Sequence, residues 1–535
     1  MRATMQRHPL SIADIFEHGE RCHGEASVTD YVDGVYRERT FAQVAAEGRR
    51  LAGALRGLGI GQGEVVATLC WNTSHHVAAY FAIPSMGAVL HTLNLRLHSS
   101  QLAYIAQHGG DRAIIVDADL VPLLLEFLPQ VPSITDVVVI GEAPAELAVH
   151  GVAVHDYATL VDASAPVEVF PRVQEDDAAV LCYTTGTTGD PKGVAYSHRS
   201  TVLHTLMIST GSVYGFSDAD RALPVVPMFH ANAWGWVHAA WWAGSGLVMS
   251  GRFLQAPHLA AMIQQTRPTM LAAVPTIWSQ LGRFAHDHDV DLTVLRVAVS
   301  GGSQLSRALS REILENNGVR LLQGWGMTET SPLLTYSRPP AGSAGSDTSV
   351  WATRTGRLLP GVHARIVSFD GAIQPWDGVS IGEVELSGNT ITGAYIALED
   401  DSKFRDGWLR TGDLGVIHRG GWVELKDRLK DGIKSGGEWI SSVELESAIA
   451  EHPAVREVAV IGVPDPKWEE RPHAFVVKEE GASVTQEDLA AFLLGRVAKW
   501  WIPERWTFST HIPRTSVGKL DKNSLRTAQA SGRHE

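Results

Sequence analysis

The sequence predicts an α/β fold in two parts: a large N-terminal domain of parallel α/β sheets with a β-rich subdomain, and a small α+β C-terminal domain. Before Gly356, short apolar strand patterns alternate with helical patterns, which is typical of βαβ units. After Gly356, short alternating strands separated by glycine turns indicate the β-rich part. A chain of 535 residues also exceeds what one hydrophobic core supports. We therefore expect an N-terminal domain over residues 1–427 and a C-terminal domain over residues 428–535.

The individual elements can be assigned in order along the chain. In the N-terminal domain we expect strands at residues 63–72, 111–120 and 178–183, helices at residues 40–59 and 78–94, and strand-then-loop units at residues 296–306 and 319–332. In the C-terminal domain, Ser441 and Glu444 have the spacing of a capping box at the start of a helix. A second helix is expected to place Leu489, Phe492, Leu493 and Val497 on one face.

Composition and charge restrict the partners. The net charge of −14 repels nucleic acid and anionic membranes, so we expect neither as a partner. The three cysteines lie far apart, which fits a reducing compartment and neither a disulfide framework nor a zinc site. Residues 222–251 contain no Asp, Glu, Lys or Arg, but their prolines, glycines and histidines favour a buried segment over a membrane span. Because the N-terminus lacks a signal-peptide pattern, the sequence predicts a cytoplasmic protein without an integral membrane segment.

A loop rich in glycine and threonine follows the strand at residues 178–183. The stretch YTTGTTGDPKGVAYSH runs from Tyr183 to His198 and lacks the Walker spacing, because Lys192 is followed by Gly193. Its glycines still let backbone amides approach oxygen atoms, and its hydroxyls and lysine suit a polyphosphate. On this stretch alone, a flexible surface loop is the alternative. The residues with the phosphate-binding chemistry are Thr184, Thr185, Gly186, Thr187, Thr188 and Lys192.

This loop and four later stretches resemble, in the same order, the signature motifs of the adenylate-forming enzymes: acyl-CoA synthetases, adenylation domains and luciferases. The later stretches are GWGMTETSP (324–332), RTGDLG (410–415), DRLKDGIKSGGEWIS (427–441) and PRTSVGKLDK (513–522). The resemblance covers essentially the whole chain. It implies an enzyme that joins a carboxylic acid to AMP, releases pyrophosphate and then passes the acyl group to a thiol. It also implies ATP, Mg²⁺ and coenzyme A as cofactors and substrates.

The resemblance implies a role for each motif in adenylation. The 184–188 loop would hold the β- and γ-phosphates, and Thr184 and Glu329 would be the Mg²⁺ ligands. Thr328 would bind the α-phosphate, and Lys519 would reach the region between that phosphate and the carboxylate. Lys192 would organise the loop. The residues expected around adenine and ribose are Gly302, Ser303, Gln323, Gly324, Trp325, Gly326, Asp413 and Arg428.

A mobile C-terminal domain is also implied, because one site performs two reactions. The hinge would be Lys430, and rotation about it would bring Gly436 and Gly437 to the site as a narrow path for pantetheine. Trp439 departs from the family pattern, since many relatives have Asn there. The indole could pack on the thiol tunnel or on the nucleotide. With no carrier domain after Lys519, free coenzyme A is the expected acceptor.

The acid is expected to be hydrophobic. The segment at 222–251 would line the acid pocket, and an amino-acid substrate would need a buried anion that this segment lacks. His230, Trp234 and Gly301 are expected beside the carboxylate and the start of the chain, with His230 also counted as catalytic. At least two of the four tryptophans in the segment are expected to be core residues.

Several alternatives stay open at this point. PMFHANAWG most resembles the branch that activates medium- and long-chain fatty acids, which also contains methylmercaptopropionate enzymes. A small or aryl acid of the methylmercaptopropionate or cinnamate type is the alternative substrate. An acyl-AMP ligase that serves a carrier protein and a non-catalytic nucleotide sensor are the alternative functions. A monomer and a homodimer are both compatible with the sequence.

Overall fold

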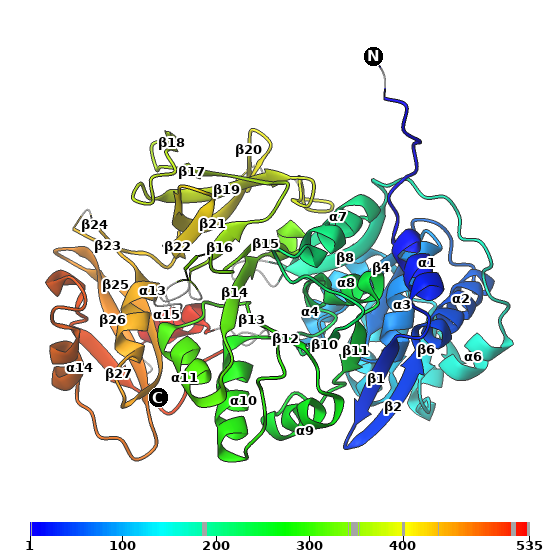
Figure 1. The fold of residues 1–535 in the computed structure, drawn as a ribbon, viewed down its shortest axis with the longest axis horizontal. Coiled ribbons are helices and arrows are strands. Elements are labelled where there is room, and N and C mark those ends of the chain that lie inside the picture. Colours follow the sequence, from blue (N-terminus) through cyan, green and yellow to red (C-terminus); the bar gives the residue numbers. More distant parts are fainter. Residues whose placement is uncertain are drawn as a thin grey trace.

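The computed structural model describes residues 1–531 except 2, 185–189, 341, 344–350, 352–353, 399–401, 437 and 515–519. It confirms the mixed α/β class, with a large N-terminal part built on two sheets and a smaller C-terminal part (Figure 1). The domain boundary expected after residue 427 stays a prediction; β22 ends at Arg428 and β23 begins at Ile433. Within the described ranges, no helix combines the length and apolar character that crossing a membrane requires.

The first sheet has seven strands among the described residues and is parallel except at β9. Its strands in spatial order are β7 (Ala153–Asp156), β6 (Asp136–Ile140), β5 (Asp111–Asp117), β3 (Val65–Leu69), β4 (Val89–Thr92), β8 (Ala178–Thr184) and β9 (Lys192–Ser197). The accompanying helices are α2 (Phe41–Gly57), α3 (Ser74–Ser85), α4 (Ser99–Gly109), α5 (Val121–Phe127), α6 (Tyr157–Ala163) and α7 (His198–Ser209). The expected strand at residues 178–183 is β8, and it ends where the glycine–threonine loop begins.

One expected element of this sheet was wrong. Residues 78–94 were expected to form a helix, whereas the helix ends at Ser85 and the remainder forms β4. The chain turns at Gly87, whose φ of 90° L-residues with side chains rarely adopt. Val89 and Leu90 then pair with β3 on one side, and Leu90 pairs with β8 on the other. Sheet pairing therefore overrides the helical spacing of the apolar residues.

The second sheet has 15 strands among the described residues and joins the remaining parallel unit to the β-rich part. Its parallel centre contains β14 (Leu321–Gly326), β13 (Val297–Ser300), β12 (Met270–Ala273), β10 (Arg221–Pro224), β11 (Gly246–Met249) and β1 (Ser27–Val32), with β2 (Val35–Thr40) antiparallel at the edge. Its β-rich end contains β15 (Leu333–Tyr336), β16 (Gly356–Leu358), β22 (Trp422–Arg428), β21 (Trp408–His418), β19 (Gly382–Gly388), β17 (Val362–Val367) and β18 (Ile373–Gln374), with β20 (Phe404–Arg405) beside β21. Its helices are α1 (Ile12–Cys22), α8 (Trp236–Ala243), α9 (Ala256–Thr266), α10 (Pro275–Asp287) and α11 (Arg307–Asn317).

The segment at residues 222–251 is buried in this sheet, as expected. It forms β10, the short 3₁₀ helix η4 (Ala231–Gly235), α8 and β11. Trp236 and Trp241 are fully buried in the core, which confirms that two of its four tryptophans serve packing. Trp242 is partly buried and stacks on His18 with ring centroids 4.4 Å apart.

The C-terminal elements lie at the opposite end of the molecule from β1 and β2 (Figure 1). They comprise β23 (Ile433–Ser435), β24 (Glu438–Ile440), β25 (Val455–Asp465), β26 (Glu469–Lys478) and β27 (Arg505–Phe508), with α13 (Ser442–Ala450), α14 (Gln486–Leu493) and α15 (Lys522–Ser531). Ser441 caps α13 by accepting a hydrogen bond from the Glu444 amide at 3.1 Å, whereas the Glu444 carboxylate pairs with Lys426 at 2.9 Å, so only half of the expected capping box forms. The second helix is shorter than expected: it ends at Leu493, because Leu494 is extended and Gly495 has a φ of 78°. Val497 therefore lies outside it.

Candidate active site

The flanks of the glycine–threonine loop form a β-hairpin. Thr184 ends β8 and lies opposite Lys192, the first residue of β9. The Lys192 ammonium lies 5.0 Å from the centroid of the Tyr395 ring. Four of the predicted phosphate-binding residues, Thr185, Gly186, Thr187 and Thr188, are outside the described residues. The hairpin therefore places the two ends of the loop, and its cation packs on an aromatic ring.

The MTET stretch forms a tight turn beside this hairpin. The turn is η5 (Thr328–Thr330), which follows β14 directly. The Tyr196 hydroxyl on β9 donates a hydrogen bond to the Thr328 carbonyl at 2.6 Å. The Glu329 carboxylate is buried, and its Oε1 accepts a hydrogen bond from the Tyr395 hydroxyl at 2.8 Å. Thr328 and Glu329 are thus held next to the phosphate-loop hairpin, although the two belong to different sheets.

The predicted adenine residues occupy the carboxyl ends of β13 and β14, which are neighbours in the parallel sheet. Gln323 is buried, and its side-chain oxygen accepts a hydrogen bond from the Leu305 amide at 2.8 Å, so it holds the loop after β13 in place. Gly301 is buried, and a Cβ there would lie 2.8 Å from Trp234 Cη2. Further along, Gly302 and Trp325 are partly buried, and Ser303 and Gly326 are exposed. These residues thus lie on neighbouring strands and the loop after β13, at the edge of a parallel sheet where ligands commonly bind.

Asp413 and Arg428 form a cross-strand pair between β21 and β22. They are directly opposite each other, with Arg428 Nε 3.4 Å from Asp413 Oδ1. Asp413 is buried and Arg428 is partly exposed. A carboxylate accepts hydrogen bonds only, so this one suits a pair of hydroxyl donors while the guanidinium balances its charge. The arrangement fits the ribose role that the resemblance implies.

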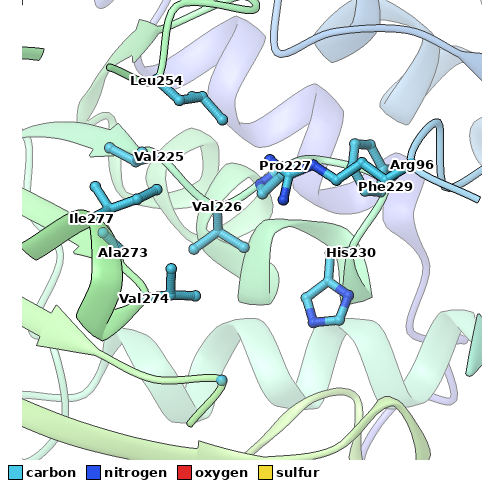
Figure 2. A pocket seen from close by; sticks show the side chains of 11 residues that line it. Arg96, Val225, Val226, Pro227, Phe229, His230, Leu254, Ala273, Val274 and Ile277 are labelled. Carbon is cyan, nitrogen blue, oxygen red and sulfur yellow. The ribbon is translucent and has the colours of Figure 1, made fainter. Parts of the chain in front are cut away.

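An apolar pocket opens at the carboxyl ends of β10 to β13 (Figure 2). About 480 Å³ of space between its lining residues is empty of atoms, and part of this space is open to solvent. None of its lining residues is acidic. The lining consists of Arg96, Val225, Val226, Pro227, Phe229, His230, Leu254, Ala273, Val274, Ile277 and Gly302. Figure 2 shows His230 and Arg96 toward one end and Leu254 toward the other.

The backbone beside this pocket is strained. Ala231, Asn232, Ala233 and Trp234 all have positive φ, between 42° and 56°, which L-residues rarely adopt in succession. Two polar contacts hold this part of the chain. The Cys182 thiol donates a hydrogen bond to Asn232 Oδ1 at 3.3 Å, and the Met228 amide, just before the segment, donates one to Asn72 Oδ1 at 2.8 Å. Strain of this kind gathers at ligand sites. Here it presents Trp234 to Gly301, where the pocket meets the predicted adenine edge.

Several residues of the site are not predicted from the sequence. Arg96 comes from the loop after β4, and its pKa is lowered by burial. Leu254 and Ile277 follow β11 and β12, and they close the pocket from outside the charge-free segment. The available signal was topological, since residues that follow adjacent parallel strands meet at one edge. Tyr395 had no such signal, because it lies in an irregular connection between β19 and β20.

The C-terminal motifs are placed only in part. Lys519 and Gly437 are outside the described residues. Lys430 follows β22, and burial lowers its pKa. Gly436 has a φ of 62°, and a Cβ there would lie 2.7 Å from the Trp468 ring. Trp439 stacks on Phe369 of the β-rich part, with ring centroids 5.4 Å apart and an interplanar angle of 10°.

The C-terminal part also contacts the N-terminal part near the pocket. Arg514 Nη1 donates a hydrogen bond to Thr276 Oγ1 at 3.2 Å, at the start of α10. On the same helix, Arg283 pairs with Glu479 at 3.2 Å. The start of the 513–522 motif therefore contacts the helix that supplies Ile277 to the apolar pocket.

The fold and these motifs define an enzyme that activates carboxylic acids with a nucleotide. The family model described as AMP-binding enzyme matches residues 16–396, and that of the AMP-binding enzyme C-terminal domain matches residues 444–519. The chain belongs to the AMP-binding enzyme family. It is an AMP-forming acyl-CoA ligase that uses ATP, Mg²⁺ and coenzyme A.

Full-length relatives support this assignment. The chain is 41% identical over 532 residues to a long-chain-fatty-acid–CoA ligase of Thermus thermophilus, covering 98% of this chain and 96% of the relative. It is 39% identical over 533 residues to a 3-methylmercaptopropionyl-CoA ligase of Ruegeria pomeroyi, covering 98% of each. Among solved structures, an anthranilate CoA ligase in complex with anthranoyl-AMP superposes with a TM-score of 0.88 at 27% identity, covering 99% of each chain.

The site fits Mg²⁺ carried by a nucleotide. Among the residues that the structure describes, no three His, Cys, Asp or Glu side chains gather into a group that could hold a metal ion alone. Mg²⁺ bound with ATP needs only one or two protein oxygens, because phosphates and water complete its shell. The buried Glu329 carboxylate, on the η5 turn, and the Thr184 hydroxyl, at the end of β8, are hard oxygen donors. Their chemistry suits this ion.

Proposed function

We propose that the chain is an ATP-dependent ligase for a medium- or long-chain fatty acid. The observation that carries the proposal is the pocket: apolar side chains form most of its lining, none of its lining residues is acidic, and His230 and Gly302 belong to it. An alkyl chain gains free energy there by leaving water, whereas an ammonium group would lack a counter-ion. The relatives of this length that act on long- and medium-chain fatty acids support the same class.

In the first half-reaction, a carboxylate oxygen of the acid attacks the α-phosphorus of ATP, and the bond to pyrophosphate breaks. Bound Mg²⁺ would neutralise charge on the phosphates, and we assign Thr184 and Glu329 as its protein ligands. Thr328 binds the α-phosphate, and Lys519 bridges that phosphate and the attacking carboxylate. Asp413 and Arg428 hold the ribose, and His230 and Trp234 flank the carboxylate. Such preorganised charge is the main means of lowering the barrier to phosphoryl transfer.

In the second half-reaction, the thiol of coenzyme A attacks the acyl carbon, and the bond to AMP breaks. We propose that the C-terminal part after Lys430 rotates about this residue between the two steps, while Arg428 stays paired with Asp413. Rotation would withdraw Lys519 and bring the glycines at 436 and 437 to the site. Large movements about a few hinge residues are common in enzymes that close around successive substrates.

A small acid is a second candidate substrate. The relative named as a 3-methylmercaptopropionyl-CoA ligase is as similar to this chain as the fatty-acid ligases are. A pocket whose space is limited by Leu254 and Ile277 would also accept a short chain. The length of the best substrate therefore separates the two candidates.

The test is pyrophosphate release with Mg·ATP across acids from acetate to palmitate, together with cinnamate and methylmercaptopropionate. Each acid is assayed with and without coenzyme A, and products are identified by mass spectrometry. The proposal expects the highest kcat/KM for a medium or long acid, with acyl-CoA formed when coenzyme A is present. A maximum at methylmercaptopropionate would establish the second candidate. Acyl-AMP that fails to react with coenzyme A would indicate a carrier protein as the acceptor.

A further inference from the structure

One connection of the β-rich part touches both sides of the phosphate site. This connection, residues 392–396, lies between β19 and β20. The Thr392 amide donates a hydrogen bond to the Glu329 carbonyl at 2.8 Å, and the Ile396 amide donates one to the Gly193 carbonyl at 3.0 Å. The connection thus links the η5 turn of one sheet to the hairpin strand β9 of the other.

Tyr395 lies at the centre of this connection and contacts the two charged groups of the site. Its hydroxyl donates to Glu329 Oε1 at 2.8 Å, and the Lys192 ammonium lies 5.0 Å from its ring centroid. The residue is 5% exposed, and Phe404 packs edge-on against its ring at 5.8 Å. The phenol is therefore held in place by packing, and both contacts have a fixed geometry.

These contacts have a direct consequence for a carboxylate that binds a cation. The last torsion of a glutamate side chain is soft, so the carboxylate plane is poorly defined without a partner. A hydrogen bond to Oε1 fixes that plane and leaves the remaining lone pairs, including those of Oε2, for another ligand. Partners of this kind orient metal-binding carboxylates and raise metal affinity. The ring face, which attracts cations, fixes the lysine in the same way.

We infer that Tyr395 is a positioning residue for adenylation: its hydroxyl orients Glu329 for Mg²⁺, and its ring places Lys192 beside the phosphate loop. The inference rests on the proposed role of Glu329 as a metal ligand. The simpler alternative is that Tyr395 only packs the connection against the site. The two differ in the Mg²⁺ dependence of nucleotide binding, which packing alone would leave unchanged.

The test is Tyr395→Phe, which removes one oxygen and keeps the ring. The rise in Tm caused by saturating ATP is measured over a range of Mg²⁺ concentrations, and again with ATP and EDTA. We expect the Mg²⁺ concentration that gives half of the effect to rise about tenfold in the variant, as is typical when such a partner is lost. The effect of ATP in EDTA should be unchanged. Tyr36→Phe, the same change on the edge strand β2, is the matched control and should leave the Mg²⁺ dependence at the wild-type value.

A double-mutant cycle with Glu329→Gln separates this inference from the role of Glu329. If Tyr395 acts through Glu329, Tyr395→Phe should have no further effect on the Mg²⁺ dependence in the Glu329→Gln background. An unchanged Mg²⁺ dependence in Glu329→Gln alone would overturn the proposed metal ligand. If the Mg²⁺ dependence shifts tenfold in Glu329→Gln and does not shift in Tyr395→Phe, Glu329 remains the proposed metal ligand and the inference about Tyr395 is wrong.

A second variant tests the contribution of the ring. Tyr395→Leu removes the hydroxyl and the ring, so it should add a rise in KM for ATP to the Mg²⁺ effect of Tyr395→Phe. Lys192→Met should show the same rise in KM, and the two changes should not add when combined. Equal behaviour of Tyr395→Phe and Tyr395→Leu in both measurements would contradict the role of the ring. The Tm without ligand, measured for each variant, identifies any loss that is purely structural.

Discussion

The acid pocket takes most of its walls from the carboxyl ends of four adjacent strands, β10 to β13, whereas the nucleotide side combines three separate regions. On the nucleotide side, the β8–β9 hairpin, the η5 turn and the pair Asp413 and Arg428 come from different parts of the chain. The pocket lining is mostly apolar, and most of it follows directly from strands of one sheet. The nucleotide side is polar and is held by single hydrogen bonds such as that between Tyr196 and Thr328.

This difference implies that the choice of acid and the reaction at the α-phosphate depend on different residues. A change in the pocket alters how much apolar surface one acid buries, so its effect depends on the acid. A change on the nucleotide side alters charge stabilisation at the α-phosphate, which is common to every acid. The same division implies that pocket variants keep ATP binding, while nucleotide-side variants keep the order of preference among acids.

The largest effect is expected for Lys519→Ala, because the proposed mechanism assigns this lysine to the adenylation step. Losing the ammonium that we propose to bridge the carboxylate and the α-phosphate should lower acyl-AMP formation about 10³-fold for every acid. ATP binding, measured by calorimetry, should stay within about twofold, because the lysine acts chiefly in the transition state. Lys499→Ala, an exposed lysine of the same domain, is the control. Wild-type turnover in Lys519→Ala would refute the proposed catalytic role of Lys519. A loss restricted to long acids would contradict the separation of acid selection from catalysis.

A smaller and acid-dependent effect is expected for Leu254→Trp in the pocket. Leu254 and His230 lie toward opposite ends of the pocket in Figure 2, so the larger side chain should block the far end and leave the carboxylate end open. We expect kcat/KM for long acids to fall roughly 100-fold relative to acids of a few carbons. The measurement is the ratio of kcat/KM for palmitate and butyrate. Leu254→Met, of similar volume, should leave the ratio near its wild-type value; an equal loss for both acids in Leu254→Trp would show that Leu254 does not limit chain length.

The sequence predicts the α/β class, with a β-rich part and a small α+β part, because strand patterns and their glycine loops are local. It fails where tertiary pairing decides, as at β4, whose apolar spacing fits a helix while its residues pair with β3 and β8. It also places the end of α14 too late, because Gly495 adopts a left-handed conformation that spacing alone does not reveal. Local patterns thus identify most elements, and long-range pairing decides the remainder.

The site shows the same limit. Glu329, Asp413 and Arg428 can be predicted as site residues from their motifs, since each motif lies within a few residues. Tyr395 and Arg96 are not, because their partners are distant in sequence: Tyr395 is 66 residues from Glu329. No local pattern encodes a contact between an irregular connection and a turn that precedes it by several strands. Such residues can be identified only from the folded structure.

The smallest effect is expected at the stack of Trp439 on Phe369, which joins the C-terminal part to the β-rich part. Aromatic pairs contribute about 0.5–1.5 kcal/mol, and Phe369 is 61% exposed, so we expect roughly a threefold effect from Phe369→Ala. The change should favour departure from the arrangement in which Arg514 contacts Thr276. Pyrophosphate release should therefore slow relative to thioester formation from synthetic acyl-AMP, by the same factor for every acid. Ile373→Ala, another exposed apolar residue of the β-rich part, is the control. A change that differs between butyrate and palmitate would mean that the contact between the two parts affects the acid pocket. It would contradict the conclusion that the choice of acid and the catalytic steps depend on different regions.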